Sequence, residues 1–374
     1  MSSAGKRGDQ AYREAGVDYA VLDAGKRLAV SAALGTSAQL ERRGGRAVDA
    51  SRGEPAFVFQ LGDQTLAFVL EGLGTKSIIA RAVAEEGRNH FADVAYDTVA
   101  AIVNDLCCVG ARPLVVNAYF STGKPDWFEH GDWHEQLIEG WFRACVDAGC
   151  AWGGGESPSL PELVNPDEIE LAGSAIGVIP ATRAPILGRE LEAGNEIVLV
   201  ASTGLHANGA SLARMVASEL ADGYATRLAG GEAFGEALLR PSHIYSRLVE
   251  AALDAGLPVT YMSHITGHGL LKLMRPSREL TYRVERLLPV PEVLEFLVDA
   301  AGMTAKVAYS TLNMGNGFAI YCARGAGEQI VALAGEQGLS AIVGGRVESG
   351  PRRVLIDPLG VELAGEQLRL GPDS

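Results

Sequence analysis

The sequence predicts two domains that each mix α-helices with β-strands, a fold class between α+β and α/β. Its length of 374 residues exceeds the size at which a single hydrophobic core usually stops growing. Strand-like and helix-like patterns alternate along the chain. A turn-rich segment at 181–188 separates two differently patterned halves. We therefore expect an N-terminal domain over 1–183 and a C-terminal α/β domain over 184–374.

The individual elements follow from the period of the apolar residues. In the first domain this period predicts three strands and three helices in the order strand 64–70, helix 77–86, helix 91–109, strand 114–120, helix 133–148 and strand 168–179. The second domain opens with a strand at 196–201, a turn at 202–209 and a helix from about 211, and ends near a strand at 352–356. We expect the last four residues, GPDS, to lack fixed structure.

Composition and charge exclude several classes of partner. The chain has 46 acidic and 32 basic residues, a formal charge of −14, and no basic stripe that would follow a nucleic acid backbone. It opens with the polar stretch MSSAGKRGDQ and contains no apolar run of about 20 residues that would span a membrane. The five cysteines form no CxxC pair and are expected to be reduced thiols. We expect a cytoplasmic protein without a nucleic acid or membrane partner.

The first candidate site is the turn after the strand at 64–70. It reads Glu71-Gly-Leu-Gly-Thr-Lys76 and leads into a helix. Glycines at 72 and 74 let backbone amides approach a phosphate, and Lys76 adds positive charge at the start of the helix. Glu71 is a candidate ligand for Mg²⁺. The pattern is not a Walker A loop, because Thr75 stands before the lysine. A plain turn is the alternative.

The second candidate is the helix at 91–109, which is apolar around most of its circumference. Asp93, Asp97 and Asn104 share one stripe of this helix, whereas Asp105 projects from an apolar face. A buried carboxylate is usually paired or bound to a metal. Asp105 is therefore expected to be either a Mg²⁺ ligand or part of a buried salt bridge.

Two further segments combine glycines with polar side chains. Gly153-Gly-Gly-Glu156 fits either a simple loop or a close approach to a ligand. In the turn at 202–209, Asn208 is either a helix cap or a site residue, and His206 is either a surface residue or an acid–base group. The Gly-rich turns at 264–269 and 313–317 add backbone donors.

Taken together, these motifs resemble the aminoimidazole ribonucleotide synthetase family, and the resemblance covers almost the whole chain. The segments that carry it are YREAGVD (12–18), GLGTK (72–76), VNDL (103–106), GARP (110–113), GGES (154–157), STGLHANGASLAR (202–214), RPSHIYSRLV (240–249), SHITGHG (263–269) and NMGNGF (313–318). Many ordered motifs in one chain are far more specific than any one of them.

The resemblance implies an ATP- and Mg²⁺-dependent cyclo-ligase of purine biosynthesis. In such an enzyme, ATP phosphorylates the amide oxygen of formylglycinamidine ribonucleotide, and an amine then displaces phosphate to close the imidazole ring. It also implies a homodimer in which the N-terminal sheets of two subunits close a barrel.

The resemblance carries over to particular residues. Lys76 would neutralise charge on the transferred phosphoryl group, and Glu71 with Asp105 would hold the metal ion. His206 would contact substrate or phosphate and is a candidate for proton transfer. The remaining positions implied at the nucleotide are Gly72, Gly74, Thr75, Asn104, Gly154, Gly155, Glu156 and Asn208.

The chain also departs from the family pattern. The family usually has Asp at the position of Glu71, Thr-Ala at the position of Ser157-Pro158, and a lysine near Ala33. A Gly-Gly-Phe-rich segment is reduced to Gly44-Gly45-Arg46. Two alternatives therefore stay open: a related ATP-dependent enzyme with another substrate, such as a thiamine-phosphate kinase, selenophosphate synthetase or hydrogenase maturation protein, or an ATP-binding paralogue without turnover.

Overall fold

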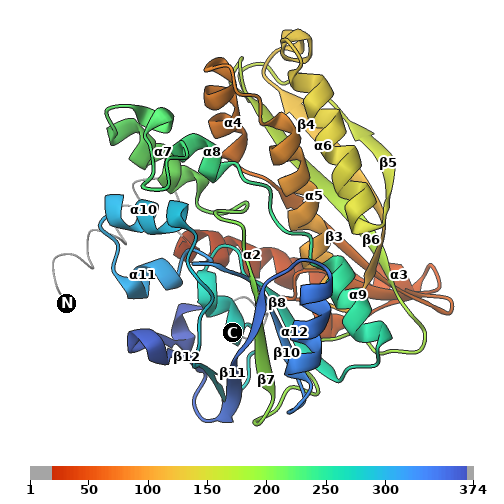
Figure 1. The fold of residues 1–374 in the computed structure, drawn as a ribbon. Coiled ribbons are helices and arrows are strands. Elements are labelled where there is room, and N and C mark those ends of the chain that lie inside the picture. Colours follow the sequence, from red (N-terminus) through yellow and green to blue (C-terminus); the bar gives the residue numbers. More distant parts are fainter. Residues whose placement is uncertain (1–18, 369–374) are drawn as a thin grey trace.

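The structure, a computed structural model, describes residues 19–368 and contains two β-sheets, each covered by helices (Figure 1). The predicted mixed α/β fold is confirmed. The motif at 12–18 and the GPDS end lie outside the described residues. All five cysteines are free thiols.

The first domain is built on a six-stranded sheet with the order β1-β2-β3-β6-β4-β5, in which only β4 and β5 pair in parallel. Its strands are β1 (Gly45–Ala47), β2 (Phe57–Leu61), β3 (Gln64–Gly72), β4 (Arg112–Thr122), β5 (Ala151–Glu156) and β6 (Ile169–Ile179). Its helices are α2 (Tyr19–Leu34), α3 (Ser37–Glu41), η1 (Asp49–Ser51), α4 (Lys76–Glu85), α5 (Phe91–Cys107), η2 (Pro125–Glu129) and α6 (Trp133–Ala148).

The second domain contains a seven-stranded sheet with the order β13-β12-β9-β11-β7-β10-β8. Its strands are β7 (Glu196–Ala201), β8 (Val259–His264), β9 (Leu280–Val284), β10 (Asn316–Cys322), β11 (Ala341–Ser349), β12 (Arg353–Ile356) and β13 (Val361–Ala364). Its helices are α7 (Ala210–Glu219), η3 (Gly223–Ala225), α8 (Phe234–Leu238), α9 (Ser246–Asp254), η4 (Gly269–Met274), α10 (Glu292–Ala300), α11 (Ala305–Tyr309), α12 (Gly327–Glu336), η5 (Asp357–Leu359) and η6 (Gly365–Gln367).

Most predicted elements are confirmed, with ends that move by a few residues. The predicted helix at 133–148 and strand at 196–201 coincide with α6 and β7. The strand at 64–70 is longer than predicted, because β3 continues through Glu71 and Gly72. The loop interpretation of Gly153–Glu156 is wrong, since these residues belong to edge strand β5, where glycine reaches the neighbouring backbone closely.

Helix α5 is the central helix of the first domain and reaches toward the second. A Cβ on Gly140 of α6 would lie 1.9 Å from the carbonyl oxygen of Ala92, so only glycine allows α6 to pack this closely on α5. In Figure 1 the C-terminal end of α5 lies beside α9 and β8. The polar residues toward the C-terminal end of α5 are therefore placed between the domains.

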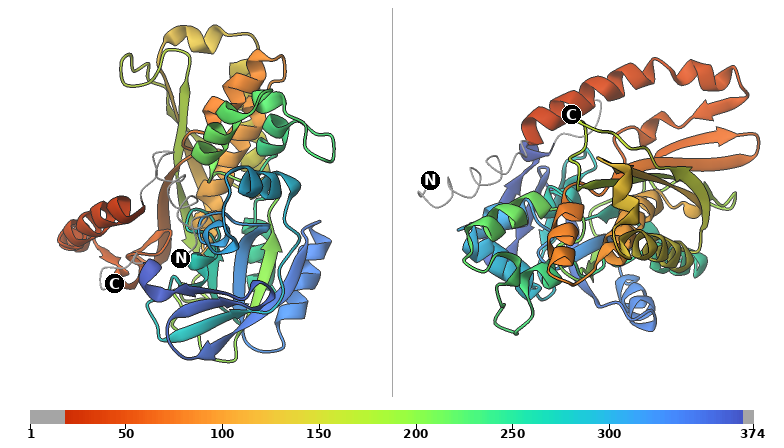
Figure 2. Two further views of the ribbon diagram at one scale, coloured as in Figure 1. Left: turned by 90° about the vertical axis from the view of Figure 1, so that its left-hand side faces the viewer. Right: turned by 90° about the horizontal axis from the view of Figure 1, so that it is seen from above.

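One face of the first sheet remains open. Helices α5 and α6 cover the face on which Ala67, Val69 and Ala175 are buried. On the opposite face, Phe68 is 44% exposed, Leu70 69% and Leu114 44%. Figure 2 shows this sheet from the side, with α4, α5 and α6 gathered on one face and α2 set apart from them. An exposed apolar sheet face of this kind is typical of an interaction surface.

Candidate active site

The turn from β3 to α4 carries the first group of expected site residues. Gly74 has a φ of +74°, a conformation that favours glycine. Thr75 directly precedes α4, and its Oγ1 lies 3.1 Å from the Oγ of Ser211, near the start of α7. The N-terminal ends of two helices from different domains therefore meet here. Their partial positive charges suit this place to an anion.

Lys76 follows in the first turn of α4 and is fully buried. Its ammonium group forms an ion pair with Asp97 of α5, which is also fully buried. The other carboxylate oxygen of Asp97 accepts a hydrogen bond of 2.6 Å from the backbone N–H of Ser242 in the second domain. Pairing explains how two charges can be buried together. The expected contact of Lys76 with a phosphoryl group stays a prediction.

Asn104 lies two turns further along the same stripe of α5. Its Nδ2 donates to the carbonyl oxygen of His243, and its Oδ1 accepts from the backbone N–H of Tyr245, both at 2.8 Å. The side chain is fully buried. Asp97 and Asn104 thus hold the segment 242–245 of the second domain against α5. This placement gives Asn104 a positioning role, and its contact with a nucleotide stays a prediction.

Asp105 makes a contact across the domains. Its Oδ1 lies 2.7 Å from Nδ1 of His264, at the end of β8. Burial by itself raises the pKa of Asp105, but the hydrogen bond and charge of His264 outweigh burial and hold the pKa of the carboxyl below its usual value. The charges of Lys272 and Arg275 act in the same direction. Of the two expectations for Asp105, the structure shows a pairing with a histidine, and the contact of Asp105 with Mg²⁺ stays a prediction.

His206 lies in the turn between β7 and α7 and adopts an unusual backbone conformation. Its φ is +59°, which is uncommon for a residue other than glycine. The ring is 3% exposed, so the surface alternative is wrong. Nε2 accepts a hydrogen bond of 3.1 Å from the backbone N–H of Thr203, which places the ring proton on Nδ1. The Nδ1 atom is buried and has no hydrogen-bond partner among residues 19–368.

Electrostatics keep His206 neutral. Burial lowers the pKa of His206 well below its usual value. Positive charge on Lys76 and on two neighbouring histidines adds to this effect. A neutral ring with its proton on Nδ1 acts as a hydrogen-bond donor and not as an acid at neutral pH.

Asn208 and Gly209 complete this turn. Gly209 has a φ of +107° and occupies the position before α7, and no side chain caps the helix. The helix-cap interpretation of Asn208 is therefore wrong. Asn208 is partly exposed, and its expected role at the nucleotide stays a prediction.

Gly154, Gly155 and Glu156 lie on the far side of the first sheet from the β3–α4 turn. In register, Glu156 pairs with Tyr119, Tyr119 with Ala172, and Ala172 with Gly72. Three strand spacings therefore separate Glu156 from Gly72, which is roughly 14 Å. Residues in one row share a face, so the side chain of Glu156 belongs to the open face. The structure does not bring these two groups into direct contact.

The expected metal ligands do not form a complete metal site by themselves. Glu71 pairs in register with Gly173, on the face that α5 covers. Within residues 19–368, no three or more His, Cys, Asp or Glu side chains gather in a way that could hold a metal ion. Mg²⁺ commonly uses only one or two carboxylates and takes its other ligands from water and phosphates. The ionised carboxylate of Asp105 fits such a site.

Three residues of the site were missed as site residues by sequence reasoning, although all three lie in quoted motifs. His264 ends the strand before the Gly-rich turn at 264–269, and His243 belongs to RPSHIYSRLV. The third, Tyr245, packs between histidines, with ring centroids 6.4 Å from His206 and 6.4 Å from His264. The sequence signal that could have identified His264 is a histidine at the end of a buried strand.

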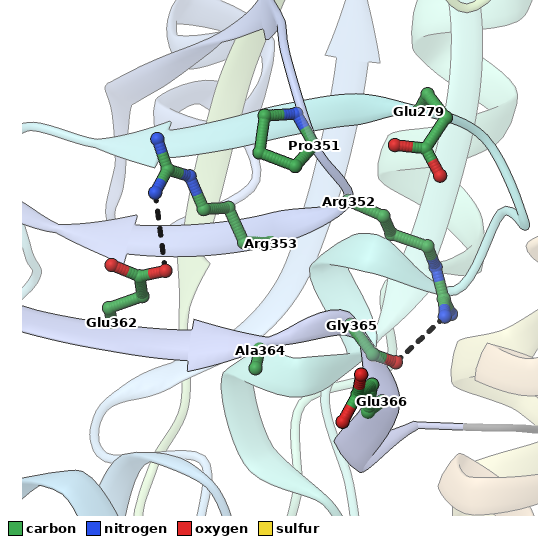
Figure 3. A pocket seen from close by; sticks show the side chains of 8 residues that line it. All are labelled: Glu279, Pro351, Arg352, Arg353, Glu362, Ala364, Gly365 and Glu366. Carbon is green, nitrogen blue, oxygen red and sulfur yellow. Dashed lines mark hydrogen bonds and ion pairs between the residues drawn. The ribbon is translucent and has the colours of Figure 1, made fainter.

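A hollow of about 600 Å³ lies away from these residues, at β12 and β13 (Figure 3). Its arginines already have partners within the protein. Arg353 pairs with Glu362 at 3.2 Å, and Arg352 donates to the carbonyl oxygen of Gly365 at 2.9 Å. This hollow is therefore a poor candidate for the active site.

Fold and site together define a two-domain α/β protein in which Gly-rich turns and buried charged residues converge between the domains. Residues 53–179 match the family described as AIR synthase related protein, N-terminal domain, and residues 192–358 match its C-terminal domain. The chain belongs to this AIR synthase related family. No helix within residues 19–368 has the length and apolar character needed to cross a membrane.

Similar proteins fall in the same family. The chain is 37% identical to the phosphoribosylformylglycinamidine cyclo-ligase of Anaeromyxobacter sp. (strain Fw109-5), over 75% of this chain and 79% of that protein. It is 36% identical to the enzyme of that name from Sorangium cellulosum (strain So ce56), over 90% and 95%. Its fold resembles the hydrogenase maturation protein HypE in complex with ATP, with a TM-score of 0.59 and 19% identity over 82% of this chain and 86% of that one.

Proposed function

We propose that this protein is an ATP-dependent cyclo-ligase that converts formylglycinamidine ribonucleotide to aminoimidazole ribonucleotide in cytoplasmic purine biosynthesis. The observation that carries this proposal is similarity over 90% of the chain to a relative with that enzyme name. ATP phosphorylates the amide oxygen, because an amide oxygen leaves readily only as phosphate. An amine nitrogen then forms the new C–N bond, and phosphate leaves.

The nucleotide phosphates bind where the turn at Gly72–Lys76 meets the start of α7. Thr75 and Ser211 link the two helix ends, with 3.1 Å between their hydroxyl oxygens. Backbone amides at helix ends hold phosphate oxygens, and the positive ends of both helix dipoles stabilise charge on the transferred group. Lys76 contributes its charge from directly behind this turn. Gly154, Gly155 and Glu156 extend the site along the open face of the sheet, and Asn104 and Asn208 lie at its interdomain side.

Asp105 and Glu71 are the residues that hold Mg²⁺ in this proposal. When bound, the ion would neutralise negative charge on the phosphate groups. Asp105 stays ionised because its pKa lies below the usual value despite burial, owing to His264. Glu71 is one methylene longer than the aspartate usual in the family.

His206 contacts the substrate or a phosphate oxygen as a neutral donor. Burial lowers its pKa, so an imidazolium acid is not available at neutral pH. The N–H at Nδ1 has no partner within the described chain. A ligand oxygen satisfies this donor, which is costly to leave unpaired.

The open face of the first sheet pairs with a second copy of the chain to close a barrel. Phe68, Leu70 and Leu114 supply the exposed apolar surface for this homodimer. We expect Leu70→Glu to convert the dimer to a monomer in sedimentation velocity. Leu163→Glu is the matched control, because Leu163 is 78% exposed and lies outside the sheet. A wild-type protein that sediments as a monomer contradicts the dimer.

The activity is tested by ADP release and by a colour assay for the aminoimidazole product. Purified protein is given Mg²⁺ and ATP, with and without formylglycinamidine ribonucleotide. Substrate-dependent appearance of both products is the expected result. If ATP binds but neither product forms, the substrate assignment fails, and a related enzyme with another substrate or a paralogue without turnover takes its place.

A further inference from the structure

A groove between the two domains adjoins the proposed ATP site. It has a volume of about 510 Å³ and is bordered by α4 of the first domain and by α7 and η3 of the second. Ile78 and Arg81 line it from α4, and Ser211, Arg214 and Met215 from α7. Its volume lies in the range of small-molecule sites. A ligand bound here would touch both domains.

The charge of this groove differs from that of the other hollows described. Its only charged lining residues are Arg81 and Arg214, and no carboxylate lines it. In contrast, the hollow at β12–β13 contains three glutamates beside its two arginines. A hollow beside η1 has three arginines together with Asp49 and Glu54. In a chain with a net charge of −14, a groove lined by arginines and by no carboxylate indicates an anionic ligand.

The two arginines are not equivalent. Arg81 is neutralised, because it pairs with Glu168 at 2.8 Å and with Glu85 at 2.7 Å. Arg214 forms no hydrogen bond or ion pair with any residue from 19 to 368, although its charge reaches Glu168 and Tyr224. The partly buried guanidinium of Arg214 is therefore available to a ligand. Its planar group of donors matches the oxygens of a phosphate.

Tyr224 adds a second donor to the groove. Burial raises the pKa of Tyr224 to about 12, so its hydroxyl keeps its proton at neutral pH. Ile78 and Met215 provide an apolar wall suited to the carbon skeleton of a sugar. The groove thus combines a cation, a neutral donor and an apolar surface.

The position of the groove connects it to the reaction. Ser211 lines the groove, and its hydroxyl lies 3.1 Å from Thr75 in the turn proposed to hold the ATP phosphates. We infer that the groove binds the 5′-phosphate of the ribonucleotide substrate, with Arg214 as the main contact and Tyr224 as a second donor. This inference rests on the proposed function for the identity of the substrate.

A binding measurement tests the groove without turnover. Ribose 5-phosphate is titrated into wild-type protein, Arg214→Gln and Arg324→Gln by isothermal calorimetry. Arg324 is exposed and lies outside the groove, so its variant is the matched control. We expect Arg214→Gln to weaken binding by about tenfold or more, the usual effect of losing a charge-assisted hydrogen bond. Equal binding by all three proteins, or no binding by the wild type, overturns the inference.

Kinetics then identify the group that Arg214 contacts. The KM for formylglycinamidine ribonucleotide is compared with that for the same compound without its phosphate. Arg214→Gln should raise the KM for formylglycinamidine ribonucleotide by about tenfold. It should leave the KM for the compound without phosphate unchanged, because that compound cannot make the contact with Arg214 in the wild type either. The KM for ATP should stay at its wild-type value. An equal rise in KM for both substrates contradicts a phosphate contact.

The two experiments separate the two levels of the proposal. If the protein turns over the ribonucleotide but its binding of ribose 5-phosphate does not depend on Arg214, the cyclo-ligase activity is supported and the phosphate site at Arg214 is contradicted. If ribose 5-phosphate binding depends on Arg214 but the ribonucleotide is not turned over, the phosphate site is supported and the cyclo-ligase activity is contradicted. Tyr224→Phe should weaken binding by a smaller factor than Arg214→Gln, because it removes only a neutral donor.

Discussion

Two buried ion pairs on α5 differ in what they connect. Lys76–Asp97 joins α4 to α5 within the first domain, and both side chains are 0% exposed. His264–Asp105 joins the second domain to α5, and its side chains are 4% and 16% exposed. The first pair is closed off from solvent, whereas the second lies where solvent or a ligand can reach Asp105. The first pair therefore holds two helices of one domain together, whereas the second joins the two domains at a partly accessible place.

Breaking the first pair should have the largest effect. Asp97→Ala leaves the ammonium group of Lys76 buried without a partner and removes the acceptor for the N–H of Ser242. We expect a loss of about 3–5 kcal/mol in the free energy of unfolding, measured by urea denaturation. The double variant Lys76→Met, Asp97→Leu should recover part of this loss, since no buried charge remains. A loss below about 1 kcal/mol for Asp97→Ala would show that the pair is not buried in solution.

Asn104 lies on α5 between Asp97 and Asp105, and it connects the two domains through hydrogen bonds of an uncharged side chain. Asn104→Ala removes the partners of the His243 carbonyl and the Tyr245 amide. Two unsatisfied buried groups should cost about 2–4 kcal/mol. Limited proteolysis should then show faster cleavage between the domains than in the wild type. Asn104→Asp keeps the acceptor for Tyr245 but places a buried carboxylate oxygen against the carbonyl oxygen of His243, so it should cost at least as much as the alanine variant.

The second pair should be weaker than the first. Asp105→Asn removes the charge but keeps an oxygen that can accept from Nδ1 of His264. We expect a loss of about 1 kcal/mol in the free energy of unfolding without ATP or Mg²⁺, again by urea denaturation. A loss of unfolding free energy as large as that of Asp97→Ala would show that the two pairs contribute equally to stability.

The buried histidines should give the stability a gradual dependence on pH. Burial lowers the pKa of His206 and of His243 below the ordinary value of 6.5. The unfolded chain therefore binds more protons than the folded chain below pH 6.5, and stability falls as the pH falls from about 7 toward 5. Each histidine contributes at most about 1.4 kcal/mol per pH unit. Unfolding of wild type and His206→Asn across this range measures the slope, which should be shallower in the variant. A slope unchanged by His206→Asn contradicts a neutral buried His206.

Asparagine is a suitable replacement for His206 for two reasons. It tolerates a positive φ better than most residues, so the backbone at +59° is retained. Its Nδ2 also stands near the position of the histidine Nδ1 and can donate a hydrogen bond. His206→Gln places its donor one bond further out and should not replace this function in turnover.

Much of the candidate site was predictable from local sequence. Glycines, Thr75 and Lys76 before a helix already indicate a phosphate turn, and β3 places them at a strand end. Asp105 was predicted to need a partner because a carboxylate on an apolar helix face cannot be left alone. The identity of that partner, His264, was not predictable, because 159 residues separate the two.

The groove at Arg214 could not be predicted at all. Its two arginines lie on helices from different domains. The i,i+4 spacing of Arg81 and Glu85 in α4 indicates one partner for Arg81, but the second partner, Glu168, lies 87 residues away. Only packing places Glu168 beside Arg81 and leaves Arg214 without a hydrogen-bond or ion-pair partner within residues 19–368.

The sequence by itself determined most of the helices and strands predicted from it, the two-domain architecture and the family, because local periodicity and ordered motifs are properties of neighbouring residues. The tertiary structure decided which charges are paired. Lys76 meets Asp97 across 21 residues, and Asn104 meets the backbone of His243 and Tyr245 across 139 and 141 residues. Such pairings depend on how helices and sheets pack in space, and packing is set by contacts along the whole chain rather than by any short stretch of it.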